Sequence, residues 1–116
     1  MKSRKAIIRA LDAAFSRYIR TRDGHCVTCG SREGLQCGHL LPRSAMATRW
    51  DERNAYAQCE RCNNRHEEDP EPLKAVFIQR HGAAAYTQLL ARWSHPVRRT
   101  TVELETLLLE WLRRVK

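Results

Sequence analysis

Two pairs of cysteines with C-x-x-C spacing are the residues of this chain best suited to bind a metal. A C-x-x-C turn presents two thiolates to one ion, and two such turns complete a tetrahedral zinc site. The segment between the pairs, residues 30–58, is long enough for two strands that leave the metal and return to it. Protein thiolates would then fill every position, so the zinc would be structural. The predicted ligands are Cys26, Cys29, Cys59 and Cys62.

One cysteine, Cys37, remains outside these pairs. Five cysteines are an odd number, which argues against a disulfide framework and for metal binding in a reducing compartment. We expect Cys37 to be a small buried residue. A role at the candidate centre is the alternative, because it lies two residues before His39 and on the same face of a strand.

Three polar residues between and just after the cysteine pairs have side chains suited to phosphodiester hydrolysis. A histidine at the end of a strand can act as a general base near neutral pH. An asparagine at the start of the paired strand can orient that imidazole, and one at the start of the next helix can ligate a cation. Oxygen ligands favour Mg²⁺ or Mn²⁺, which stabilise charge on a phosphate and its leaving oxygen. In chain order these residues are His39, Asn54 and Asn63.

The charge of the chain indicates a polyanionic partner. The formal net charge is +8, and arginine is a large share of the basic residues, which suits phosphate recognition. A charge that serves only solubility is the alternative interpretation. Three arginines in or beside the proposed centre could each hold a DNA phosphate, or could be solvated loop charges: Arg43, Arg49 and Arg65.

Hydrophobic periodicity predicts the elements that would position these residues. Apolar residues recur at helical spacing in the N-terminal segment, residues 1–22. Short strands are expected at 35–41 and 54–58, and a helix at 60–68 begins on the second cysteine pair. Residues 23–68 would thus form a zinc-bound ββα core, and helical patterns fill residues 72–116.

The last helical pattern is the best defined. Thr100 and Glu103 have the spacing of a capping box. We expect the apolar stripe after it to pack within the molecule, and a dimer interface through the C-terminal helices is the alternative. The stripe consists of Leu104, Leu107, Leu108, Trp111, Leu112 and Val115.

These patterns predict one domain, 1–116, of the α+β class. It would be mostly helical, with a two-stranded antiparallel sheet flanked by N- and C-terminal helices and stabilised by zinc, because so short a chain forms only a modest core. No apolar run reaches the length of a membrane span, and the N-terminus lacks the apolar core of a signal peptide. We therefore expect a cytoplasmic protein with no membrane partner.

The order C-x-x-C, Gly-His, Asn, C-x-x-C-Asn resembles that of the HNH endonucleases, which have a ββα-metal centre. Over nearly its whole length the chain also resembles the NinG (Rap) recombination proteins of lambdoid phages. The matching segments are Tyr18-Ile19-Arg20-x-Arg22-Asp23 before C-x-x-C-G, Cys37-Gly38-His39-Leu40, and Gln58-Cys59-x-x-Cys62-Asn63-Asn64.

The resemblance implies a DNA endonuclease that uses a divalent metal. His39 would activate water, Asn54 would orient His39, and Asn63 would bind Mg²⁺ or Mn²⁺ from the helix. The likeness to NinG adds a role in phage or prophage recombination, with branched or junction DNA as the substrate.

One position departs from the HNH pattern. Most HNH enzymes carry a metal-binding Asp directly before the base, where this chain has Gly38. His66, three residues after Asn63 on the same helical face, is the best substitute as a ligand. Cys37, Asp51 and the His39 ring are weaker candidates. The missing Asp keeps a second hypothesis open, a zinc-ribbon DNA-binding module without catalysis.

Overall fold

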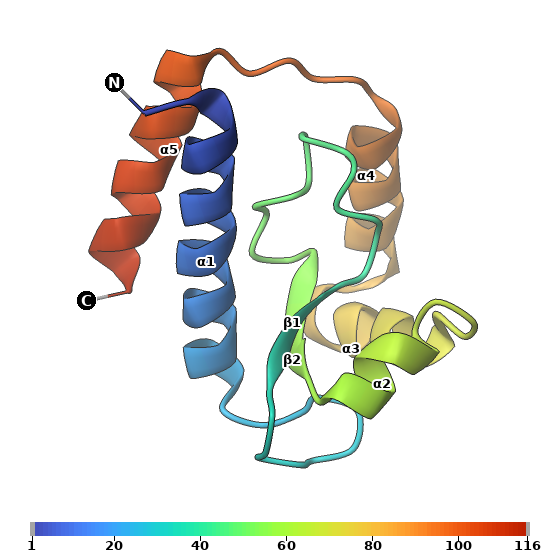
Figure 1. Ribbon diagram of the computed structural model, residues 1–116. Coiled ribbons are helices and arrows are strands. Elements are labelled where there is room, and N and C mark those ends of the chain that lie inside the picture. Colours follow the sequence, from blue (N-terminus) through green and yellow to red (C-terminus); the bar gives the residue numbers. More distant parts are fainter. Residues whose placement is uncertain (1, 116) are drawn as a thin grey trace.

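The computed structural model describes residues 2–115 and has the predicted α+β character, mostly helical with a two-stranded antiparallel sheet (Figure 1). The helices and strands agree with the sequence prediction in order and type. They are α1 (Arg4–Asp23), β1 (Gln36–His39), β2 (Ala55–Gln58), α2 (Glu60–Arg65), α3 (Glu71–His81), α4 (Ala83–Ser94) and α5 (Thr101–Arg114).

The sheet lies between two layers of helices, α1 with α5 on one side and α3 with α4 on the other (Figure 1). Alternation along β2 explains this arrangement, because neighbouring residues of a strand face opposite sides of the sheet. Ala55 packs in the cluster formed with α1 and α5, whereas Tyr56 packs in the cluster formed with α3 and α4. Every residue of β2 is therefore buried, while β1 is partly exposed.

Helices α1 and α5 pack along each other, as Figure 1 shows. The apolar stripe predicted for α1 is confirmed at Leu11, Phe15 and Ile19, which are buried. The ring of Phe15 meets that of Trp111 edge to face at 5.0 Å. The capping box at Thr100 is also confirmed, since its hydroxyl accepts from the Glu103 N–H and the Glu103 carboxylate accepts from the Thr100 N–H.

The stripe of α5 packs mainly within the molecule, as expected. Leu104, Leu108 and Trp111 are buried against α1, and Leu112 is 44% exposed. An apolar strip on the outer side of α5 stays exposed at Val102, Leu109 and Leu112. The prediction of a dimer through the C-terminal helices remains a prediction.

Asp23 joins three elements at the end of α1. Its carboxylate accepts a hydrogen bond of 2.9 Å from the Ala57 N–H of β2 and forms salt bridges with Arg22 and with Arg80 of α3. Burial raises the pKa of Asp23, but these partners more than offset that effect and lower it. These contacts fix the position at which the chain leaves α1 and continues to the first cysteine pair. Among residues 2–115, no helix is both long and apolar enough to cross a membrane.

Candidate functional site

The four cysteines predicted to bind zinc come together at one end of the sheet. Their sulfur atoms all lie within 4.8 Å of one another, and those of Cys29 and Cys59 are 3.6 Å apart. Tetrahedral zinc with bonds of about 2.3 Å places its sulfurs about 3.8 Å apart. The cluster therefore fits a structural zinc. Cys37 lies outside it.

Local backbone structure builds each half of this cluster. The first pair sits in a turn closed by a hydrogen bond of 2.8 Å from the Gly30 N–H to the Cys26 carbonyl. Gly30 has φ 84°, a conformation that a side chain would disfavour. In the second pair Cys59 is the N-cap of α2, and Cys62 follows one turn later. Both turns are consequences of the sequence next to the cysteines.

The thiols of the cluster differ in pKa. Burial raises the pKa of Cys26, but the Thr28 hydroxyl and nearby backbone N–H groups lower it to about 5. For Cys62 the Thr28 hydroxyl lowers the pKa, whereas burial and the other three cysteines raise it to about 11. Thiolates so close together repel one another, and a dication among them would remove that repulsion.

A groove of about 910 Å³ runs along the exposed edge of β1, between α1 and α2. It collects residues that are far apart in the sequence. Four of the predicted site residues line the groove: His39, Arg43, Asn63 and His66. The α1 side is formed by Asp12, Ser16 and Arg20.

The His39 ring is held on two sides. It lies 5.9 Å from the ring of Phe15, and its Nε2 is 2.8 Å from the main-chain oxygen of Arg49. A nitrogen that faces a carbonyl carries the proton, so Nδ1 keeps its lone pair in the neutral ring. Burial lowers the pKa of His39, and this effect outweighs the opposing hydrogen bond to Arg49. The lowered pKa favours the neutral ring, which can accept a proton.

The predicted role of Asn54 in orienting His39 is not a direct one, because among residues 2–115 its side chain makes no hydrogen bond to the His39 ring. The buried amide accepts from the Leu41 N–H at 2.9 Å and donates to the carbonyls of Leu41 and Thr48. Asn54 therefore holds the loop that follows β1. It acts on His39 only through that loop, which carries the Arg49 carbonyl.

Arg49 also differs from expectation. Its guanidinium donates to both carboxylate oxygens of Asp12, at 2.6 and 3.1 Å, and its side chain is 16% exposed. The same carboxylate accepts from the Trp50 indole at 3.0 Å. Arg49 is therefore engaged in fixing the loop to α1, not free to hold a phosphate. No pattern in the sequence paired Asp12 with Arg49, and sequence reasoning missed Asp12.

The polar groups on the other side of β1 come from α2 and the residue after it. Asn63 donates from Nδ2 to the Gln36 side chain at 2.9 Å. His66 Nε2 faces the Leu40 carbonyl at 2.9 Å, and its buried Nδ1 has no hydrogen-bond partner among the described residues. An unpartnered lone pair of this kind suits a cation or a donor on a ligand.

Comparison with known proteins connects this arrangement to a family. The family profile described as "Bacteriophage Lambda NinG protein" matches residues 1–116. The chain belongs to the NinG family. The whole chain aligns at 30% identity with the protein ninG of Salmonella phage P22, and the alignment covers 59% of that relative. It is 32% identical to that of Escherichia phage 933W, with 89% of the chain covering 53% of the relative.

The protein ninG of Escherichia phage lambda is 30% identical, with 89% of the chain covering 52% of that relative. The chain thus spans between half and three-fifths of the length of these NinG relatives. No solved structure matches it.

The remaining predicted residues in this NinG chain have distinct surroundings. Arg43 is 63% exposed at the groove and lies 3.7 Å from Asp12. Arg65 is exposed and outside the groove lining. Asp51 forms salt bridges with Arg92 and Arg53, so its carboxylate is already engaged. Burial raises the pKa of Cys37 to about 12, which disfavours the thiolate that a cation would need.

Proposed function

We propose that this NinG chain is a metal-dependent DNA endonuclease of the HNH type. One observation carries the proposal: the His39 ring, whose Nε2 lies 2.8 Å from the Arg49 main-chain oxygen, lines the same groove as Asn63 and His66. The elements around it follow the order β1, β2, α2, with the cysteine cluster at their end. That order is the one expected for a ββα-metal centre.

His39 is the general base in this proposal. Its Nδ1 accepts a proton from a water molecule as the water oxygen attacks phosphorus. The bond between phosphorus and the 3′ oxygen breaks, and that oxygen leaves and takes up a proton from solvent. The Arg49 carbonyl keeps the ring in the required tautomer and stabilises the imidazolium, because it accepts from Nε2–H throughout.

Asn63 and His66 would hold the divalent cation, and Gly38 gives no ligand of its own. The unpartnered Nδ1 of His66 and the carboxamide of Asn63 fit this task. A bound Mg²⁺ or Mn²⁺ supplies positive charge beside the phosphate and the leaving oxygen.

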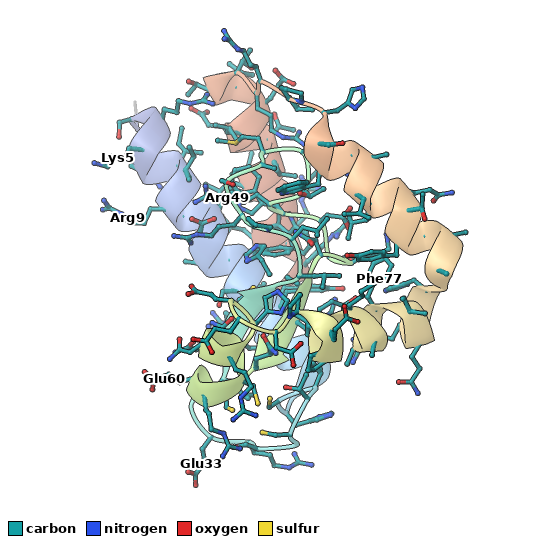
Figure 2. All side chains as sticks on the ribbon, turned by 90° about the vertical axis from the view of Figure 1, so that its right-hand side faces the viewer. Lys5, Arg9, Glu33, Arg49, Glu60 and Phe77 are labelled. Carbon is teal, nitrogen blue, oxygen red and sulfur yellow. The ribbon has the colours of Figure 1, made fainter. Side chains whose placement is uncertain are left out.

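The charge of the groove favours DNA as the substrate. Arg20 and Arg43 line it, and Lys5 and Arg9 continue the same face of α1 at helical spacing. Lys5 and Arg9 extend away from α1 into solvent (Figure 2). Contacts of this kind bind phosphates with little base specificity, which suits branched DNA in phage recombination.

A cleavage assay tests the proposal. Plasmid, linear and four-way-junction DNA would be incubated with Mg²⁺, Mn²⁺ or EDTA, using wild type and His39→Ala. We expect nicking only with metal, and a loss of at least about a hundredfold in His39→Ala. His95→Ala is the matched control, since His95 is exposed and outside this groove. Equal nicking by wild type and His39→Ala would exclude His39 as the base.

Gly38 favours one alternative, a zinc-ribbon module that binds DNA without cutting it. This alternative predicts salt-sensitive DNA binding and no cleavage with any metal. The same assay separates the two functions, provided that a binding measurement on the junction DNA accompanies it.

A further inference from the structure

Gly38 lies next to two side-chain oxygen atoms. A Cβ atom built on Gly38 would stand 2.3 Å from Gln58 Oε1 and 2.9 Å from Asn63 Oδ1. The first distance is an overlap, so the space beside Gly38 is already filled. The atom that fills it is an oxygen, on the side toward which an Asp at this position would extend its carboxylate.

Gln58 places this oxygen in an unusual environment. The residue is 2% exposed, and its Oε1 is buried with no hydrogen-bond partner among the described residues. Its Nε2 is directed toward the Thr28 hydroxyl at 3.5 Å, which leaves Oε1 turned toward Gly38. A buried carbonyl oxygen without a partner is costly, and a water molecule or an ion can supply the missing partner.

Asn63 presents a second oxygen to the same point. Its Nδ2 is engaged by the Gln36 side chain at 2.9 Å, and this contact directs Oδ1 toward Gly38. Two amide oxygens directed at the same point repel each other. A hard cation, which prefers oxygen ligands, removes that repulsion.

We propose that Gln58 is a ligand of the divalent cation, and that with Asn63 it supplies the oxygen that Gly38 lacks. The glycine is then part of the site, because any side chain at position 38 would displace the Gln58 amide. The proposal deepens the proposed function and rests on it for the use of the cation, while the binding itself is independent of cleavage.

The neutral charge of these two ligands has a consequence for affinity. Sites that bind divalent cations tightly use carboxylate ligands. Mg²⁺ sites with only one or two carboxylates rely on the phosphates of the substrate for further ligands. We expect Mn²⁺ to bind the free protein weakly, near the millimolar range, and a negative charge at position 58 to strengthen binding.

The test measures Mn²⁺ binding to zinc-loaded protein without DNA. Electron paramagnetic resonance follows the loss of the free Mn²⁺ signal up to about 10 mM Mn²⁺. We expect Gln58→Glu to bind at least about tenfold more tightly and Gln58→Leu about tenfold more weakly than wild type. Gln88→Glu is the matched control, since it adds the same charge at an exposed position of α4 and should change nothing.

A paired substitution keeps the test decisive if Gln58→Leu folds poorly. Gly38→Asp alone should be destabilised, because its Cβ meets Gln58 Oε1 at 2.3 Å. Gly38→Asp combined with Gln58→Ala places a carboxylate in the vacated space and should recover or exceed wild-type Mn²⁺ affinity.

The outcomes separate this proposal from the proposed function. If wild type binds no Mn²⁺, or if Gln58→Glu and Gln58→Leu bind it as wild type does, Gln58 is not a ligand. If both shift binding as expected and no DNA is cut, the cation site stands and the nuclease assignment fails. Zinc content is measured throughout, and a variant that keeps one zinc per chain has an intact cysteine cluster.

Discussion

The Nε2 atom of His39 lies 2.8 Å from the main-chain oxygen of Arg49, ten residues further along the chain. This contact joins the end of β1 to a loop that is itself fixed to α1 through Asp12. The position of the proposed base therefore depends on the packing of three segments, and several consequences can be measured.

The first prediction concerns pH. Burial lowers the pKa of His39 below its ordinary value of 6.5, and only the neutral ring can accept a proton. The cleavage rate should therefore rise with pH through a midpoint below 6.5 and be level above it. Rates of plasmid nicking from pH 4.5 to about 8 would show this limb. A midpoint above 6.5 would contradict the assigned base.

A second prediction concerns the Asp12 carboxylate. Asp12→Ala removes the partners of Arg49 and of the Trp50 indole, so it should lower the free energy of unfolding by about 2 kcal/mol. The cleavage rate should fall as well, because the Arg49 carbonyl loses its fixed position. Urea denaturation and nicking assays measure the two effects. Glu105→Ala, at an exposed position of α5, should alter neither.

Asn54 should be important chiefly for stability. Asn54→Ala leaves the Leu41 N–H and two carbonyls without their partner in a buried site, which should cost about 3 kcal/mol. Asn54→Asp keeps the acceptor for Leu41 but loses both donors, so its unfolding free energy should not return to that of wild type. A stability of Asn54→Ala within about 0.5 kcal/mol of wild type would show that the amide does not hold the loop.

Metal analysis tests the cysteine cluster. We expect one zinc per chain in wild type, and loss of zinc with a lower melting temperature in Cys26→Ser or Cys62→Ser, because folding and metal binding are coupled. Cys37→Ala is the control, since Cys37 lies outside the cluster and should leave the zinc content unchanged. A metal content far from one zinc per chain would refute the four-cysteine site.

Arg43 should contribute to DNA affinity in a way that depends on salt. Its side chain is 63% exposed at the groove, so Arg43→Ala should weaken binding to all DNA sequences alike. The slope of log affinity against log salt should become shallower by about one unit. Arg113→Ala on α5 removes the same charge elsewhere and is the comparison. Identical slopes for the two variants would place the DNA contact away from Arg43.

The sequence determined the features that depend on neighbouring residues. The C-x-x-C turns, the capping box of α5 and the apolar stripe of α1 each arise within a few residues, where spacing fixes geometry. The cysteine cluster, the order of elements and the presence of His39, Asn63 and His66 at one groove could therefore be anticipated.

Tertiary structure decided what lies between those features. The loop from Pro42 to Arg53 has no periodicity, so no pattern indicated that its Arg49 carbonyl would meet His39 or that Asp12 would hold Arg49. Asn54 likewise became a loop-holding residue, and Gln58 filled the space beside Gly38. Contacts between residues distant in the chain depend on how whole helices and strands pack. The spacing of residues along the sequence does not predict that packing.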